Sequence, residues 1–310
     1  MNKAPFHAGE VAMQQAAGVH ERLRELGPRV IRDHMPGQHR EFFEQLPMLL
    51  VGSVDAQQRP WASLLTGLPG FIHTPDPQHL RVEALPSGDD PLHAQLRVGA
   101  TLGLLGIEPQ TRRRNRVNGT LVAVDSQGFT LRVDQSFGNC PQYIQARSPQ
   151  WVGAGAAAHA SQREGPRLSA AAASLVANAD TLFIASAAPG HGADVSHRGG
   201  KPGFVRISDE GGATVLTLPD FRGNFFFNTL GNIVAHPRAG LLFVDHDTGR
   251  VLQLTGRAGV VASGPEVEAF AGAQRLLRIS IEEGLWASQP LPLRWSAPQQ
   301  ASQLEATGHW

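Results

Sequence analysis

Two short stretches in the second half of the chain carry the residue types that bind an anion. SHRGGKPG (196–203) contains two cations, and LPDFRGNFFFNTL (218–230) contains an arginine, a glycine and two asparagines around three phenylalanines. A phosphate requires several converging donors: guanidinium and ammonium groups, amide side chains, and free N–H groups at the start of a helix. We expect Gly223 to allow close backbone approach, Asn224 to cap a helix, and Asn228 to follow one turn later. Together the two stretches predict an anion site.

The first half of the chain contains a counterpart of each stretch that lacks these cations. ASLLTGLPGFI (62–72) aligns with VSHRGGKPGFV (195–205) at an offset of 133, and LGLLGI (102–107) aligns with AGLLFV (239–244) at an offset of 137, so four residues are inserted between the blocks. SLLTGL therefore stands where the second half has SHRGGK, and Asp89 and Asp90 lie in the counterpart of the arginine-containing stretch. We interpret the chain as an internal duplication in which only the second copy is built for an anion. Chance matches between short strand sequences are the alternative.

The elements that must position these residues are mostly strands. Apolar residues at helical spacing predict a helix over 9–26 that ends at Gly27 and Pro28, and HREFFEQL (39–46) predicts a short second helix. Strand-like runs follow from residue 48 to residue 133, and 147–167 is rich in Gly, Ala, Ser and Pro, which is typical of a connector. The second half repeats this order: a helix over 168–179, strands, a helix beginning near Asn224, further strands, and a helical piece near PEVEAFAGAQRLL (265–277).

Bulk composition excludes several classes of protein. The chain has 310 residues, 41% of them hydrophobic, and equal numbers of basic and acidic residues (27 each), so it has no overall field that would attract nucleic acid or a membrane surface. Cys140 is the single cysteine, which rules out an intrachain disulfide. No apolar segment resembles a signal peptide or a membrane span. We expect a cytoplasmic protein.

Several segments together resemble a known superfamily. DVSHRGGKPGFVRI, LPDFRGNFFFNTLGNIVAHPRAGLLFV and LQLTGRA are similar to the FMN-binding split β-barrels of the pyridoxamine 5′-phosphate oxidase-like superfamily, and PMLLVGSVDAQQRPWASLLTGLPGFI with SFGNCPQYIQAR is similar to the first half of its two-barrel members. The resemblance covers roughly residues 5–285. It implies a mainly β fold of two tandem split β-barrels with flanking helices. The implied units are a helical segment (1–46), a first, degenerate barrel (47–147), a connector (148–167), an FMN-binding barrel (168–285) and a tail (286–310).

The resemblance also implies which residues hold the cofactor. In this superfamily the FMN phosphate is bound by basic and polar side chains of a strand pair and by the start of the next helix. Carried over by position, the implied cofactor-binding residues are Ser196, Arg198, Lys201, Arg222, Asn224, Asn228, Thr229 and Gln253. Asn139, Cys140 and Tyr143 are implied to lie near the flavin or to close its pocket. The segments GFVRIS and LPLRWSAP depart from true pyridoxamine phosphate oxidases, so we do not expect pyridoxamine phosphate as the substrate.

Three other features allow alternative interpretations. A thiol at Cys140 near a flavin could be redox-active, but a lone cysteine is more often a small buried hydrophobe. RRRNR (112–116) suggests nucleic acid, but no aromatic residues interleave with it, which favours a solvated loop or a contact to a ligand phosphate. His191 with His197, and the run DHD (245–247), fit no recognisable zinc spacing, and we expect no metal site.

These observations lead to three hypotheses. The first is an FMN-dependent oxidoreductase in which the flavin N5 exchanges a hydride with an unknown small molecule, with no catalytic acid or base identified. The second is a flavin- or haem-binding carrier or sensor without turnover, and the third is a nucleic-acid-associated protein that uses RRRNR. Because single-barrel relatives place the cofactor between two barrels of a dimer, the duplicated chain could form that interface internally, between chains, or both. We expect a homodimer.

Overall fold

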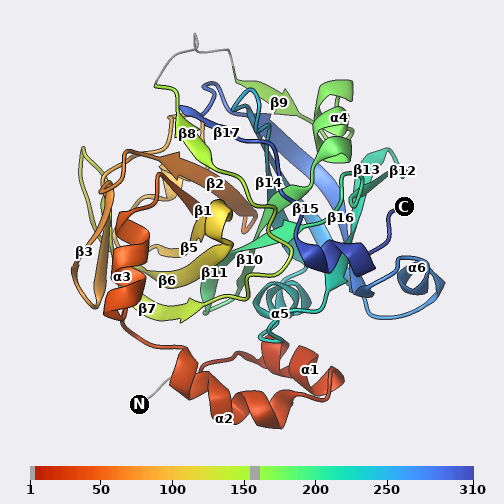
Figure 1. The fold of residues 1–310 in the computed structure, drawn as a ribbon, viewed down its shortest axis with the longest axis horizontal. Helices are drawn as coiled ribbons and strands as arrows, with labels where there is room; N and C mark the ends of the chain where they lie inside the picture. The colour runs from red at the N-terminus through yellow and green to blue at the C-terminus, as the bar shows by residue number, and fades with distance from the viewer. Residues whose placement is uncertain (1–3, 154–160) are drawn as a thin grey trace.

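Two antiparallel β-sheets dominate the computed structural model, which describes residues 4–153 and 161–310 (Figure 1). The first sheet has the order β2-β1-β5-β6-β7-β4-β3. Its strands are β1 (Met48–Val54), β2 (Pro60–Thr66), β3 (Ile72–Asp76), β4 (His79–Val82), β5 (Thr101–Glu108), β6 (Arg113–Val124) and β7 (Phe129–Gly138).

The second sheet repeats that order as β11-β10-β14-β15-β16-β13-β12, with β9 added beside β16. Its strands are β9 (Gln162–Glu164), β10 (Thr181–Ala188), β11 (Gly192–Gly199), β12 (Arg206–Glu210), β13 (Ala213–Phe221), β14 (Arg238–Val244), β15 (Val251–Val261) and β16 (Ala273–Trp286). A small separate pair joins β8 (Pro149–Trp151) to β17 (Leu293–Trp295). The described part of the chain is therefore mainly antiparallel β structure.

The strand registers of the two sheets coincide at the offsets read from the letters. Val51 of β1 lies opposite Ser63 of β2, and Ile184 of β10 lies opposite Ser196 of β11, which is an offset of 133 at both positions. The pairs further along, Leu50 with Leu105 and Phe183 with Leu242, place β5 and β14 at the offset of 137. The strand pairing therefore aligns the two halves at the same offsets as the sequence comparison does.

The two sheets pack against each other through glycines at equivalent positions. A Cβ atom at Gly103 of β5 would lie 2.4 Å from the Cα atom of Asp194, and a Cβ atom at Gly240 of β14 would lie 2.4 Å from the carbonyl oxygen of Pro60. Each central strand therefore touches the edge hairpin of the other sheet backbone to backbone. No side chain larger than hydrogen fits at these two crossings, so the glycines set the distance between the halves.

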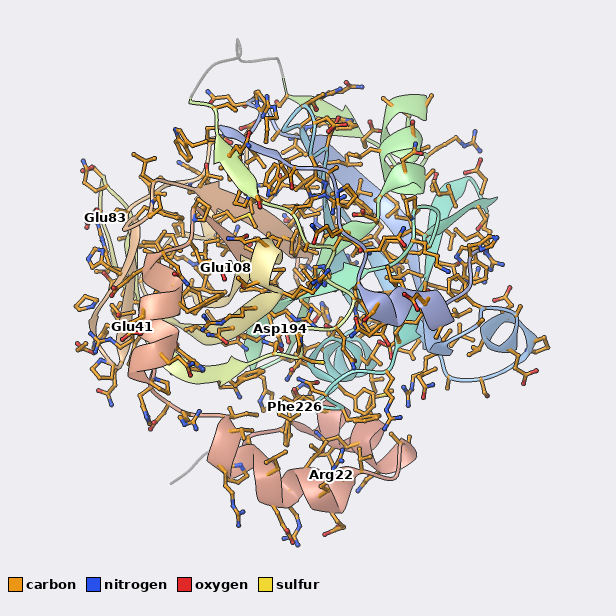
Figure 2. The ribbon with its side chains drawn as sticks, in the orientation of Figure 1. Arg22, Glu41, Glu83, Glu108, Asp194 and Phe226 are labelled. Carbon is orange, nitrogen blue, oxygen red and sulfur yellow. The ribbon has the colours of Figure 1, made fainter. Side chains whose placement is uncertain are left out.

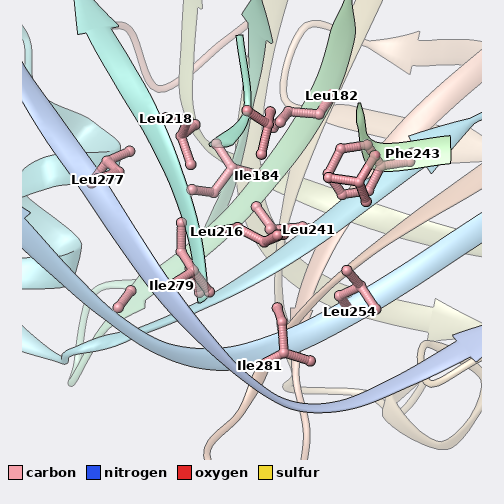
Figure 3. Packing of buried hydrophobic residues seen from close by; sticks show 14 of the residues in the cluster. Leu182, Ile184, Leu216, Leu218, Leu241, Phe243, Leu254, Leu277, Ile279 and Ile281 are labelled. Carbon is pink, nitrogen blue, oxygen red and sulfur yellow. The ribbon is translucent and has the colours of Figure 1, made fainter. Parts of the chain in front are cut away.

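Each half has its own hydrophobic core, and a third core joins them. Figure 3 shows the second-half core, in which Leu182, Ile184, Leu216 and Leu241 meet between the strands. The first-half core is built from β1 to β7 together with the aromatic face of helix α3 (Gly37–Glu44). The shared core contains residues of β1, β2 and β5 beside residues of β10, β11 and β14. The halves are consequently one packed body.

The helices lie outside the sheets. Their bounds are α1 (Ala8–Ala16), α2 (His20–Val30), α3 (Gly37–Glu44), α4 (Ala170–Asn178), α5 (Asn228–Ala235) and α6 (Pro265–Glu268). Figure 1 shows α1 and α2 together beneath α5. None of the helices in residues 4–153 and 161–310 has the length and apolar character needed to cross a bilayer.

Three of the predicted helices are wrong in their bounds. The helix expected over 9–26 is two helices, because Gly18 takes a positive φ of 69° between them, and the second continues through Pro28 to Val30. The helix expected near Asn224 begins at Asn228. The helical piece expected over 265–277 ends after four residues, and Ala273–Trp286 is the long strand β16, whose neighbours on both sides supply ladder partners.

Two predicted loops also contain strands. RRRNR begins strand β6 at Arg113, and it alternates side chains between the two faces of the sheet. The connector over 147–167 includes β8 and β9, and most of its run GAGAAAHA (153–160) lies outside the described residues. In SHRGGKPG, Ser196, His197 and Arg198 belong to β11, which ends at Gly199.

We predict that Gly240→Ala destabilises the protein by about 1–3 kcal/mol, because the new methyl group must push the β2 hairpin away from β14. The matched control is Gly259→Ala in the neighbouring strand β15, where an added Cβ atom would have no other atom within 4 Å. This variant should be neutral within about 0.5 kcal/mol. Denaturant unfolding of both variants measures the difference. Equal losses for the two variants would contradict the proposed backbone contact.

Candidate anion-binding site

A cavity between the two halves collects most of the predicted site residues. It has about 970 Å³ of empty space, part of it open to solvent, and its walls come from both sheets, from the loop after β7 and from the start of α5. Nine predicted residues line it: Ser196, Arg198, Arg222, Asn224, Asn228, Thr229, Asn139, Cys140 and Tyr143. The sequence placed these residues in three separate segments, and the fold brings them to one cavity.

The walls of this cavity are strongly basic. Five arginines line it, together with a single acidic residue, Asp220. Asp220 is shared by two of the guanidinium groups, at 2.5 Å from Arg198 and 3.6 Å from Arg275. Arg222, on the exposed rim, makes no salt bridge within the described residues and lies over the ring of Phe225 at 5.7 Å. Positive charge exceeds negative charge around this space, which favours an anionic ligand.

Two of the five arginines come from RRRNR in the first half, for which the sequence favoured a solvated loop or a contact to a ligand phosphate and which was not among the predicted cofactor-binding residues. Arg116 is 2% exposed; it pairs with Asp194 at 3.1 Å and donates to the Val195 carbonyl oxygen and to Ser196 Oγ. Arg114 donates to the Cys140 carbonyl oxygen at 2.7 Å. The sequence does contain a signal that these two arginines lie together. They are two residues apart at the start of a strand, and alternate residues of a strand face the same side.

Among the buried arginines of the cavity wall, Arg114 has the positive charge that neighbouring acidic groups neutralise least. Burial, reinforced by the neighbouring guanidinium groups of Arg116 and Arg198, lowers the pKa of Arg114 to about 10. It has no carboxylate partner in the described part of the chain. A pKa of about 10 leaves the group charged at neutral pH, so an anion in the cavity would relieve the cost of burying it.

Donors without acceptors gather at this cavity. Eight buried side-chain nitrogen or oxygen atoms in the described residues lack a hydrogen-bond partner, and four of them belong to residues of the cavity wall: Arg116 Nε, Arg198 Nε, Asn139 Nδ2 and His197 Nε2. The first three can only donate. Buried polar groups in native proteins are almost always paired, so this cluster indicates a missing acceptor.

Helix α5 presents its N-terminus to the same cavity. Phe227, the residue before the helix, has a left-handed φ of 60°, and no side chain caps the first turn. The prediction that Asn224 caps the helix is wrong: Asn224 Oδ1 instead accepts from the N–H group of Phe226, within the turn that precedes the helix. Asn228 is the first helical residue rather than one turn in. The uncapped N–H groups and the helix dipole favour an anion at this end.

Polar groups at the start of α5 are held from two directions. Thr229 Oγ1 donates to Ser196 Oγ at 2.9 Å, which ties the helix to β11. Asn228 Nδ2 donates to Glu10 Oε1 of α1. We call the group formed by Arg116, Ser196, Thr229 and the first turn of α5 the anion corner.

Glu10 lies in a buried junction between α1 and α5. The helices touch backbone to backbone, because a Cβ atom at Gly231 would lie 2.5 Å from the Glu10 nitrogen. Phe226 packs beside this junction, with Phe6 and Leu23 of the N-terminal segment and Phe137 (Figure 2). Burial raises the pKa of Glu10 to about 7, against the opposing hydrogen bonds from His7 and Asn228. The N-terminal helices therefore support the anion corner from behind.

Aromatic rings form another part of the wall. Tyr143 and Phe221 stack with their centroids 4.9 Å apart, and Phe225 and Phe227 lie nearby in the edge-to-face arrangement at 6.0 Å. The cavity thus combines a basic region with flat apolar surfaces, which is the composition expected of a site for a ligand with an anionic group and a ring system.

Two predicted cofactor residues lie outside the cavity. Lys201 Nζ donates to the Thr307 carbonyl oxygen at 2.7 Å, so its charge caps the C-terminal segment. Gln253 is 1% exposed and donates to the Ala62 carbonyl oxygen, in the first half of the chain. Lys201 lies in the turn after β11, and Gln253 lies within β15. Among residues 4–153 and 161–310, no three His, Cys, Asp or Glu side chains are placed to hold a metal ion.

Comparisons with known proteins give only distant likenesses. No protein-family model and no curated protein matches the chain. Several solved structures are similar to part of it, among them the following three. HupZ of Group A Streptococcus is 14% identical, with a TM-score of 0.31, over 38% of this chain and 91% of that chain. An FAD-binding protein of Mesorhizobium loti is 18% identical, with a TM-score of 0.28, over 42% of this chain and 99% of that chain. HutZ, the haem storage protein of Vibrio cholerae, is 14% identical, with a TM-score of 0.27, over 39% of this chain and 94% of that chain. At these values the function must be argued from the chain's own residues.

We predict that Glu10→Gln makes the protein more stable than the parent at pH 8 and leaves it nearly unchanged near pH 4. A buried acid whose pKa is raised binds its proton more tightly in the folded state, so the parent loses stability as pH rises from the unfolded value of 4.5 through about 7. The shift corresponds to about 3 kcal/mol at most. Urea unfolding at both pH values measures the gap. Glu21→Gln, at an exposed glutamate of α2, is the control, and a gap that does not change with pH would contradict the assignment.

Proposed function

We propose that the chain binds FMN in this cavity and acts as an FMN-dependent oxidoreductase on a small molecule. The observation that carries the proposal is the group of unpaired buried donors in a cavity lined by five arginines. A phosphate supplies several acceptor oxygens and negative charge in one small volume, which is what these donors lack. The resemblance of the surrounding sequence segments to FMN-binding split barrels supports the same ligand.

The residues present fit the two chemical parts of FMN. The anion corner, with Arg198 and Arg222, would hold the phosphate, and the aromatic wall around Tyr143 and Phe221 would hold the ring system. When bound, FMN supplies a ring that accepts or gives a hydride at N5. The chain's own contribution is to orient the ring, to donate hydrogen bonds from Asn139 and the arginines, and to exclude water on the buried side.

The first half contributes directly to the proposed site. Arg114, Arg116 and the loop Asn139–Tyr143 belong to it, while β11, α5 and β16 belong to the second half. We infer that the chain is a duplicated split barrel whose two copies form, within one polypeptide, the arrangement that single-barrel relatives form by dimerisation. One chain then suffices to build one site, and a homodimer remains a separate prediction that a solution mass measurement can test.

His197 supports a second candidate, a haem-binding carrier or sensor. It lines the cavity, its Nε2 atom has no partner, and burial together with Arg114 and Arg198 lowers its pKa well below the usual range. The imidazole is therefore neutral at physiological pH, the form that can bind a haem iron as an axial ligand. The five arginines fit the propionate groups of haem as well as a phosphate.

We predict that Arg222→Ala raises the Kd for FMN about 10- to 100-fold, because it removes a charge-assisted contact worth about 1.5–3 kcal/mol. Arg222 is exposed and makes no salt bridge with described residues, so folding should be unaffected. The matched control is Lys201→Ala, a nearby cation outside the cavity, which should bind FMN like the parent. Fluorescence titration of apoprotein with FMN gives both values. Parental affinity in Arg222→Ala would place the phosphate elsewhere.

We predict that the purified protein is yellow and releases FMN, identified by mass, on denaturation. Bleaching by NADH or NADPH followed by reoxidation in air would support an oxidoreductase, whereas a flavin that no reductant bleaches would support a carrier. A red preparation with a Soret band that is lost in His197→Ala would favour haem. A colourless protein that binds neither ligand on reconstitution would contradict both candidates.

A further inference from the structure

The first half contains a structural counterpart of the anion corner. Gln253 in β15 holds the register position that Arg116 holds in β6, because each lies opposite the equivalent leucine of the neighbouring strand, Leu242 and Leu105. The two side chains also make equivalent contacts across the junction of the halves. Arg116 donates to the carbonyl oxygen of Val195 and to the hydroxyl group of the next residue, a serine. Gln253 does the same at Ala62 and the serine that follows it, at 2.9 and 3.1 Å.

The two corners differ in what fills them. In the second half, α5 begins without a side-chain cap and faces open cavity. In the first half, the equivalent segment before β5 begins with Asp90, whose carboxylate accepts from the Leu92 N–H group at 2.8 Å, from Ser63 Oγ at 2.6 Å and from Gln253 Nε2 at 3.3 Å. The Asp90 carboxylate therefore accepts hydrogen bonds from a backbone N–H group, from a serine hydroxyl group and from the side chain that crosses from the other half.

We propose that Asp90 is a built-in anion that occupies the first-half copy of the anion corner, so that the chain takes one external anionic ligand, at the second half, instead of two. The serine, the crossing side chain and the start of the helical segment are common to both corners. Only the source of the anion differs: a side chain in one corner and a ligand in the other. The inference depends on the anion corner but not on the ligand being FMN.

The remaining residues of the first-half corner agree with an internal anion. Its strand β2 carries Leu64 and Leu65 where β11 carries His197 and Arg198, and Gln253 replaces the guanidinium of Arg116 with a neutral amide. A single carboxylate in a corner without cations needs only neutral donors, whereas a phosphate of higher charge needs the arginines. Burial raises the pKa of Asp90, and the three hydrogen bonds that converge on its carboxylate oppose this rise and favour the ionised form.

Asp90→Ala tests the proposal, because it leaves the three donors in place and vacates the volume of one carboxylate. We expect the variant to melt below the parent, and added sodium formate to raise its Tm by about 2–4 °C in a saturable manner that sodium chloride at equal ionic strength does not reproduce. The parent and Asp89→Ala should show at most the smaller response that comes from the open corner of the second half. Asp89 is the matched control, since its carboxylate binds Ser288 and not the corner.

If Asp90→Ala does not fold, Asp90→Ser vacates most of the same volume while keeping one acceptor oxygen. A formate-specific, saturable rise in the Tm of either folded variant that exceeds the rise in the parent and in Asp89→Ala supports the proposal. A folded Asp90 variant whose Tm responds to formate no more than the parent does overturns it. The outcome is independent of flavin: Arg222→Ala in the second corner tests the proposed function, and the formate response reports only on the first.

Discussion

The buried guanidinium of Arg116 is the interaction on which the site and the joining of the two halves both depend. It extends from β6 of the first half to Asp194, to the Val195 carbonyl oxygen and to Ser196 in β11 of the second half. Removing one partner of such a buried pair costs about 3–5 kcal/mol, because the other charge is left uncompensated. Since Ser196 also accepts from Thr229 at the start of α5, the position of the helix N-terminus follows from the same contact. The halves cannot slide without dismantling the anion corner.

Sequence patterns predicted the strands and their repetition well, because alternation and turn residues are local properties. The offsets of 133 and 137 recur in the strand registers, and the second-half residues chosen for anion binding meet in one cavity, apart from Lys201 and Gln253. The errors lie where tertiary contacts outweigh local preference. The last five residues of the predicted helical piece, 273–277, instead begin strand β16, because β13 and β15 flank it. The charged run RRRNR forms the start of β6 because β5 and β7 pair with it on both sides.

The places of Arg114 and Arg116 in the site could not be assigned from the sequence for a similar reason. Arg114 and Arg116 reach the cavity only because the crossings at Gly103 and Gly240 bring the two sheets together, and nothing in the letters fixes how two repeats face each other. Likewise, Glu10 lies more than 200 residues from α5 in the chain, and its contact with Asn228 depends on the backbone approach of α1 at Gly231. Short-range patterns locate donors, whereas the convergence of donors is decided by packing.

If the chain is the internal duplication that we propose, the basic cavity accounts for the difference between its two halves. Five arginines around one aspartate, with buried donors left unpaired, raise the free energy of the unliganded folded state, and an anion that binds there returns part of that cost as stability. A chain with two such cavities would carry this penalty twice. The first half avoids this free-energy cost, because it has leucines in β2, a neutral amide at Gln253 and a carboxylate at Asp90. It still keeps the contacts that hold the sheets together. On this argument the first half can remain a structural partner, supplying Arg116 to the other half's cavity, because its own corner no longer needs a ligand to be stable.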